Sequence, residues 1–131
     1  MREPDMEIDG WCLESGEAYH ANTPTTFWIP DLARRESLEP GDLAKLIFQI
    51  SVDNSEEPIA VERMWVLVRE RIAGGYLGVL DNEPSAISEN DEFWLGTELP
   101  FAAHHVINIE EKDQKTMALA QEEPRKRWPT Q

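Results

Sequence analysis

Apolar and polar residues alternate most regularly in the middle of this chain. From Leu43 to Val52 every second residue is apolar and the residues between them are mainly polar, which is the period of a strand with one buried face. Residues 62–72 form a second strand, and the stretch Met64 to Val68 is apolar on both faces, which indicates a central position in a sheet. Ala73-Gly74-Gly75 permits positive φ and predicts a hairpin turn into a third strand at residues 76–80. Consecutive strands joined in this way predict an antiparallel sheet.

Shorter apolar runs extend this sheet. Gly78, inside the third strand, predicts a bulge or a bend, as a small curled sheet requires. One helical turn is expected at residues 102–105, and the further strand candidates are residues 18–20, 93–95, 98–101 and 106–109. The pattern predicts a small α+β fold: a strongly bent, barrel-like antiparallel sheet of about five strands with one or two short helices.

Two short helices fit the remaining pattern. Pro30 can occupy a helix start, which favours a brief helix at residues 31–36. Asp113 can cap a helix over residues 114–123, which Pro124 terminates. Because this second helix has few apolar residues, we expect it to dock weakly.

The length of 131 residues fits a single domain. We expect a flexible acidic arm at residues 1–10, one α+β domain at residues 11–110, and a C-terminal helix with a polar tail at residues 111–131. The chain has no apolar run long enough to span a membrane and no apolar stretch near its start that would serve as a secretory signal. With Cys12 as the single cysteine, a reducing cytoplasm is the expected compartment.

The net charge of −14 narrows the possible partners. Residues 1–60 carry 13 acidic and 4 basic side chains, residues 61–101 carry 8 and 3, and residues 102–131 carry 5 of each. A surface this acidic argues against binding nucleic acid, whose phosphates need a cationic surface. It is compatible with a basic protein partner, and equally with solubility alone.

Four motifs between residues 27 and 109 together resemble the uncharacterised bacterial YegJ-like domain family. They are Phe27-x-Ile29-Pro30, Leu38-x-Pro40-Gly41-Asp42-Leu43-x-Lys45-Leu46-Ile47-Phe48, Glu62-x-Met64-Trp65-Val66 and Gly78-x-Leu80-x-Asn82-x-Pro84. The resemblance implies a small α+β domain of bacterial origin and assigns no activity or catalytic residue. Some family members are exported, whereas this chain shows no signal for export.

Histidine and cysteine offer little for metal or nucleophilic chemistry. His104 and His105 are adjacent, so their side chains are expected to diverge on a strand or a helical turn and not to share a metal ion. His20 adds a third imidazole without metal-ligand spacing. Cys12 has no nearby histidine or asparagine and is interpreted as a buried or incidental thiol. We predict no metal site.

Acidic and glycine clusters also lack a catalytic pattern. The carboxylates from Asp81 to Glu92 have no base between them, no enclosing aromatic cleft and no calcium-loop spacing, so a solvated acidic loop is the better interpretation. Gly74-Gly75 and Gly78 lack the lysine and the following helix of a phosphate-binding loop, which leaves a hairpin. No catalytic residue and no cofactor are predicted.

Two functions remain open. Tryptophans beside acidic loops suit a protein interface, although ordinary core packing explains them as well. The first hypothesis is a non-enzymatic, cytoplasmic interaction module for a basic partner, in its sharpest form an immunity-type inhibitor. Its expected interaction surface is Asp53, Glu56, Glu57, Asp81, Glu83, Glu89, Asp91, Glu92 and Trp94. The alternative is a small hydrolase or ligand-binding domain, which needs a concave pocket near His104 or Asp91.

Overall fold

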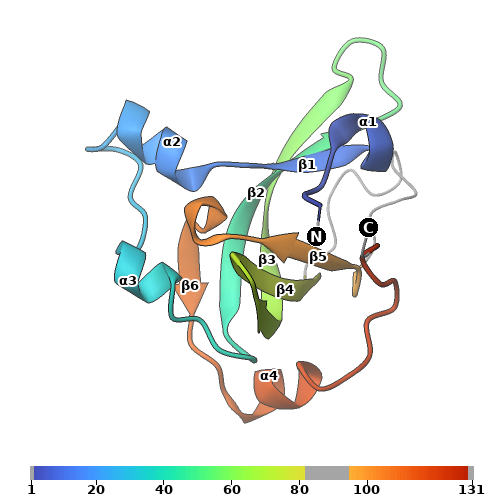
Figure 1. Ribbon diagram of the computed structural model, residues 1–131. Coiled ribbons are helices and arrows are strands. Elements are labelled where there is room, and N and C mark those ends of the chain that lie inside the picture. The colour runs from blue at the N-terminus through green and yellow to red at the C-terminus, as the bar shows by residue number, and fades with distance from the viewer. Residues whose placement is uncertain (1, 82–94, 130–131) are drawn as a thin grey trace.

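The computed structural model describes residues 2–81 and 95–129. These residues form a strongly curled antiparallel sheet with short helices around it (Figure 1). The strands are β1 (Trp11–Glu14), β2 (Leu43–Ser51), β3 (Ile59–Ile72), β4 (Gly75–Leu80), β5 (Glu98–Phe101) and β6 (Asn108–Glu110). The helices are α1 (Met6–Asp9), α2 (Gly16–Asn22), α3 (Leu32–Arg35), the 3-10 turn η2 (Ala103–His105) and α4 (Gln114–Leu119).

The main path of the sheet runs β1-β2-β3-β4-β5, with every pair antiparallel. The sixth strand, β6, pairs with residues 43–45 of β2, and β1 pairs with residues 47–50 of the same strand. The two short strands therefore lie end to end along one edge of β2, while β3 occupies the other edge. The α+β fold with a bent antiparallel sheet, expected from the hydrophobic pattern, is confirmed.

The pairing of β3 with β4 contains an irregularity. The register between these strands shifts from Val68 to Glu70, opposite Gly78. A Cβ atom at Gly78 would lie 2.5 Å from the carbonyl oxygen of Leu67, so only glycine lets the two backbones approach this closely. The irregularity predicted at Gly78 is therefore confirmed as a register shift, although the extra residue, Arg69, lies in β3, opposite the strand that contains Gly78.

The core fills the concave side of the sheet. Alternate residues of β2, from Ala44 to Ile50, are fully buried there, as the period-2 pattern predicts. Met64, Val66 and Val68 of β3 pack on the same side. Leu67 is also buried, although its side chain alternates to the other face, which confirms that the middle of β3 is covered on both sides.

The helices correct one prediction and refine two. Residues 18–20 lie in α2 and not in a strand, because the Ser15 hydroxyl accepts a hydrogen bond from the Ala18 N–H and caps a helix there. The helix expected at residues 31–36 is α3. Asp113 caps α4 as predicted, but α4 ends at Leu119, well before Pro124, and none of its residues is buried. The strand candidate at residues 93–95 falls mostly outside the described residues.

The first and last described segments of the chain lie close together beside the sheet (Figure 1). Residues 125–128, here called the C-terminal strap, run along β5, where the Glu98 N–H donates to the Lys126 carbonyl at 2.8 Å. Trp128 then enters the core, with its ring centroid 5.8 Å from that of Trp11 in β1. The strap thus links β5 to β1, and a segment expected to be a polar tail supplies a core residue.

The segment expected to be a loose arm contains α1 and contacts the strap. Arg2 forms two hydrogen bonds with the Asp9 carboxylate, at 2.7 and 2.8 Å. The Arg2 guanidinium also lies 4.6 Å from the centre of the Trp128 ring.

Across residues 2–81 and 95–129, no helix combines the length and the apolar character needed to cross a bilayer.

Candidate functional site

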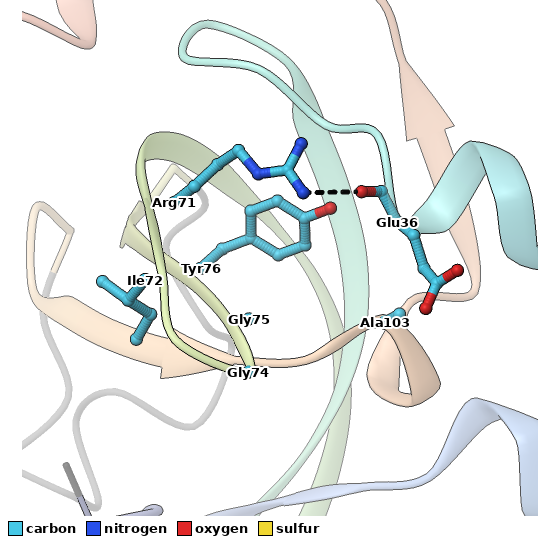
Figure 2. Close-up of a pocket in the computed structure, with 7 residues that line it drawn as sticks. All are labelled: Glu36, Arg71, Ile72, Gly74, Gly75, Tyr76 and Ala103. Carbon is cyan, nitrogen blue, oxygen red and sulfur yellow. Dashed lines mark hydrogen bonds between the residues drawn. The ribbon is translucent and has the colours of Figure 1, made fainter.

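The turn between β3 and β4 borders a shallow cavity of about 250 Å³ (Figure 2). Gly74 adopts φ +81°, which makes the turn tight, and a Cβ atom at Gly75 would lie 2.2 Å from the Phe101 carbonyl oxygen. The two glycines therefore let the turn close against the end of β5. The cavity is lined by Glu36, Arg71, Ile72, Gly74, Gly75, Tyr76 and Ala103.

The Tyr76 hydroxyl and the Arg71 guanidinium, two polar groups of this cavity, already have partners within the fold. The Tyr76 hydroxyl donates to the Arg35 carbonyl at 2.8 Å and accepts from the Leu38 N–H at 3.2 Å. Arg71 donates to the main-chain oxygen of Glu36 at 3.1 Å, and its guanidinium lies 5.7 Å from the Tyr76 ring centre (Figure 2). Ligand pockets usually span about 300–1,000 Å³. This cavity is smaller and its hydrogen bonds hold the turn in place, so it has the character of a structural crevice.

A second cavity of about 180 Å³ lies on the other side of the same glycine turn. Glu3, Ala102 and His105 help to line it. Next to it, the donor atoms of Glu3, His104 and His105 all lie within 4.8 Å of one another. This cluster, here called the Glu-His-His cluster, brings together the N-terminal segment and η2.

The prediction that His104 and His105 diverge is wrong. Their ring centroids lie 3.9 Å apart, with planes tilted by 44°. On the tight turn η2, the two side chains lean together, and the chain start supplies a carboxylate beside them. No sequence spacing signals this arrangement, because Glu3 is 101 residues from His104 along the chain.

Burial and a main-chain hydrogen bond fix the state of His105. Its Nδ1 accepts from the Ala102 N–H at 2.9 Å, so the proton of the neutral ring is on Nε2. Burial lowers the pKa of His105 to about 4, and the neighbouring His104 contributes in the same direction. The ring is therefore neutral near pH 7.

A buried arginine holds η2 in position. Arg35 donates to the carbonyl of Ala103 in η2 at 2.8 Å and to the carbonyl of Pro30 at 2.8 Å. It also pairs with the carboxylate of Glu17 in α2 at 2.7 Å. One guanidinium thus joins α2, α3 and η2 through charge-assisted bonds.

The predicted acidic surface divides into separate parts. Asp53, Glu56 and Glu57 are exposed in the β2–β3 loop. Asp81 follows β4, and its N–H donates to the carbonyl of Trp65 in β3. Trp65 is six residues from Ile59, the end of β3 that adjoins the β2–β3 loop. Asp81 therefore lies about 20 Å along the strand from that loop. Burial raises the pKa of Asp81. The other predicted surface residues, Glu83, Glu89, Asp91, Glu92 and Trp94, lie outside the described residues.

Trp65, Trp28 and Cys12 differ in how far they are buried. Trp65 is half-buried, with the Lys45 ammonium 5.5 Å from its ring centre. Trp28, by contrast, is 68% exposed. The Cys12 thiol is half-buried, 3.7 Å from the Gln49 side-chain oxygen, and burial raises its pKa, which works against nucleophilic reactivity.

Sequence reasoning missed two exposed aliphatic residues next to the acidic loop. Ile59 is 47% exposed and Val61 is 58% exposed, and both lie at the start of β3. They alternate with Ala60 and Glu62, so they share one face of the strand. The alternation from Ile59 to Glu62 was a usable signal, but the strand was expected to begin at residue 62.

Comparisons with protein-family models, with curated proteins and with solved structures found no match to this chain. The resemblance of residues 27–109 to YegJ-like domains therefore stays a prediction from the sequence, and the functional interpretation rests on the geometry.

Proposed function

We propose that this protein is a non-catalytic acidic module that binds a basic partner protein through the β2–β3 hairpin. The surface in question, here called the hairpin surface, consists of Asp53, Glu56, Glu57, Ile59 and Val61. The observation that carries the proposal is the position of two exposed aliphatic side chains directly beside three exposed carboxylates. Protein interfaces commonly combine an apolar centre with a polar rim.

The charge of the hairpin surface suits a basic partner. No ion pair among the described residues involves Asp53, Glu56 or Glu57, so their charges face solvent. The net charge of −14 adds a long-range field of the same sign. Such a field speeds encounter with a basic protein and weakens as salt is added.

The hairpin surface is held in shape before any partner arrives. The Asn54 side chain accepts from the N–H groups of Glu56 and Glu57, at 3.0 and 3.2 Å. The β2–β3 ladder continues to the Ser51–Ile59 pair, and the Val52 N–H donates to the Pro58 carbonyl at 2.9 Å beyond it. A preorganised loop loses less conformational freedom on binding, which favours affinity.

The aliphatic pair supplies the part of the binding energy that salt does not weaken. Full burial of one such side chain contributes about 1.5–3 kcal/mol relative to exposure. Ile59 and Val61 are each about half exposed, so covering both adds roughly that amount in total. Charge then governs the rate of association, and apolar contact governs the lifetime of the complex.

In its sharpest form, the proposal is an immunity-type inhibitor in a bacterial cytoplasm that covers a basic site on its target. The alternative, a small hydrolase or ligand-binding domain, draws on the cavity beside His105. That cavity measures about 180 Å³, below the usual range for ligand pockets. We therefore favour the interaction module.

A comparison of charge variants tests the proposal. The triple variant Asp53→Asn, Glu56→Gln, Glu57→Gln removes the charge of the hairpin surface. The matched control Glu7→Gln, Glu70→Gln, Glu111→Gln removes the same charge from exposed positions elsewhere. Each tagged protein is used to capture partners from source-cell lysate at low and high salt, and affinity for the captured protein is then measured.

We expect one basic protein to bind the wild type stoichiometrically and to be released at high salt. The hairpin triple should bind it at least about tenfold more weakly, and Val61→Ser should shorten the lifetime of the complex with little change in association rate. Equal weakening by both triples would indicate only nonspecific attraction. Capture of no protein at either salt would reject a stable partner.

A further inference from the structure

We propose that Glu3, His104 and His105 form a binding site for one divalent transition-metal ion of the zinc type. The site is independent of the hairpin surface and shares no residue with it. It lies where the N-terminal segment approaches η2, beside the cavity of about 180 Å³ that Glu3 and His105 help to line.

The donor atoms are close to metal-binding distances. Zinc lies about 2.0–2.2 Å from imidazole nitrogen or carboxylate oxygen, so two donors of one tetrahedral ion are about 3.3 Å apart. The three donors here are within 4.8 Å of one another. The longest of these separations has to shorten by at most about 1.5 Å, and the exposed side chain of Glu3 is free to move by that much.

The donor set selects a class of metal. Two imidazoles and one carboxylate suit zinc and its first-row neighbours, whereas magnesium and calcium prefer oxygen ligands throughout. Three protein ligands leave a coordination position for water, and the adjoining cavity provides the space for it.

Hydrogen bonds to neighbouring residues hold in place the segments that carry Glu3, His104 and His105. Arg35 fixes η2 through the Ala103 carbonyl, at 2.8 Å. The Arg2 carbonyl accepts from the Trp128 indole N–H at 3.2 Å, and Arg2 also pairs with Asp9, which anchors the residue next to Glu3. Such supporting contacts orient ligands and raise metal affinity.

One contact works against tight binding. The unprotonated nitrogen of the neutral His105 ring already accepts the Ala102 N–H, and a metal ion has to compete with that hydrogen bond. Ala102 lines the adjoining cavity, so its N–H can bond to water when the metal ion takes its place at the His105 nitrogen. We therefore expect micromolar affinity and not the much tighter binding of a closed structural zinc site.

Calorimetric titration with Zn²⁺ tests this proposal on the full chain, purified without a histidine tag. Excess Mg²⁺ and about 0.15 M salt occupy and screen the surface carboxylates, whose charge would otherwise collect ions nonspecifically. The variants are Glu3→Gln and His104→Ala, both at positions that are not buried. The controls are Glu7→Gln, on the exposed side of α1, and His20→Asn, in α2. His105 is left intact because it is buried and its loss would disturb η2.

We expect one Zn²⁺ per wild-type chain and at least about tenfold weaker binding in Glu3→Gln and His104→Ala, with both controls unchanged. Nitrogen-15 NMR of the imidazoles should show zinc-dependent shifts at His104 and His105 but not at His20. Absence of saturable binding would overturn the proposal, and so would wild-type affinity in Glu3→Gln and His104→Ala. Circular dichroism of each variant verifies that the fold is retained.

Discussion

The two tyrosines of this chain carry the same hydroxyl group in opposite surroundings. Tyr76 is buried, and its hydroxyl bonds to main-chain groups of Arg35 and Leu38, which ties β4 to the segment after α3. Tyr19 is exposed, and its hydroxyl bonds to the carboxylate of Glu14. Residue identity alone does not distinguish a structural hydroxyl from a peripheral one.

The pair offers a matched test at this scale. Tyr76→Phe leaves a buried donor and a buried acceptor without their partner, so we expect the free energy of unfolding to fall by about 1–3 kcal/mol. Tyr19→Phe removes an exposed bond and should change it by less than about 0.5 kcal/mol. Urea unfolding followed by fluorescence measures both. A Tyr76→Phe variant as stable as the wild type would mean that the two main-chain groups find other partners.

At the scale of elements, the C-terminal strap decides how the curled sheet is completed. The main-chain N–H of Trp128 donates to the Glu98 carboxylate at 3.0 Å. The Glu98 carboxylate in turn lies 3.5 Å from the Arg69 guanidinium of β3. The indole packs against Trp11 of β1. A single tryptophan at the end of the chain therefore connects three strands.

Removal of that indole should be costly. We expect Trp128→Ala to lower the free energy of unfolding by about 3–5 kcal/mol, because it leaves a large cavity between β1 and β5. Trp28→Ala is the matched control, since Trp28 is 68% exposed, and it should cost less than about 0.5 kcal/mol. Thermal and urea unfolding of both variants provide the measurement. Similar losses in the two variants would contradict a core role for the strap.

At the scale of the whole molecule, the net charge of −14 dominates. Mutual repulsion among like charges opposes the compact state. The ion pairs that offset it include Arg2–Asp9 and Arg35–Glu17, each partly shielded from solvent. Screening by salt therefore weakens the repulsion more than these attractions.

This balance predicts that salt stabilises the protein. Raising sodium chloride from about 0.01 M to about 0.5 M shortens the Debye length from about 30 Å to a few ångströms, so we expect the midpoint of urea unfolding to rise. Potassium chloride at the same concentrations is the control for ion-specific effects. A fall in the midpoint would show that attractive pairs outweigh the net repulsion.

Local patterns in the sequence were enough for most of the sheet. The alternation in β2, the apolar centre of β3 and the Gly74-Gly75 turn each depend on residues that are neighbours along the chain, so strand period and turn chemistry predicted them. Gly78 also predicted an irregularity in the sheet, because glycine inside a strand is typical of a bulge or of a close backbone approach, and the extra residue lies in the facing strand β3. The Ser15 cap of α2 is a local signal as well, but the glycine, asparagine, threonine and proline residues around it obscure the helical pattern.

The contacts that carry the candidate site were decided only by the tertiary structure. Arg2 and Trp128 are 126 residues apart in sequence yet share a hydrogen bond, and Glu3 meets His104 and His105 across 101 and 102 residues of chain. Such meetings leave no periodic trace, because they depend on how the curled sheet brings the two ends together. The sequence by itself determined the central strands β2, β3 and β4, the hairpin turn at Gly74-Gly75 and the acidic character of the surface. The tertiary structure alone decided which isolated residues became core, crevice or ligand cluster.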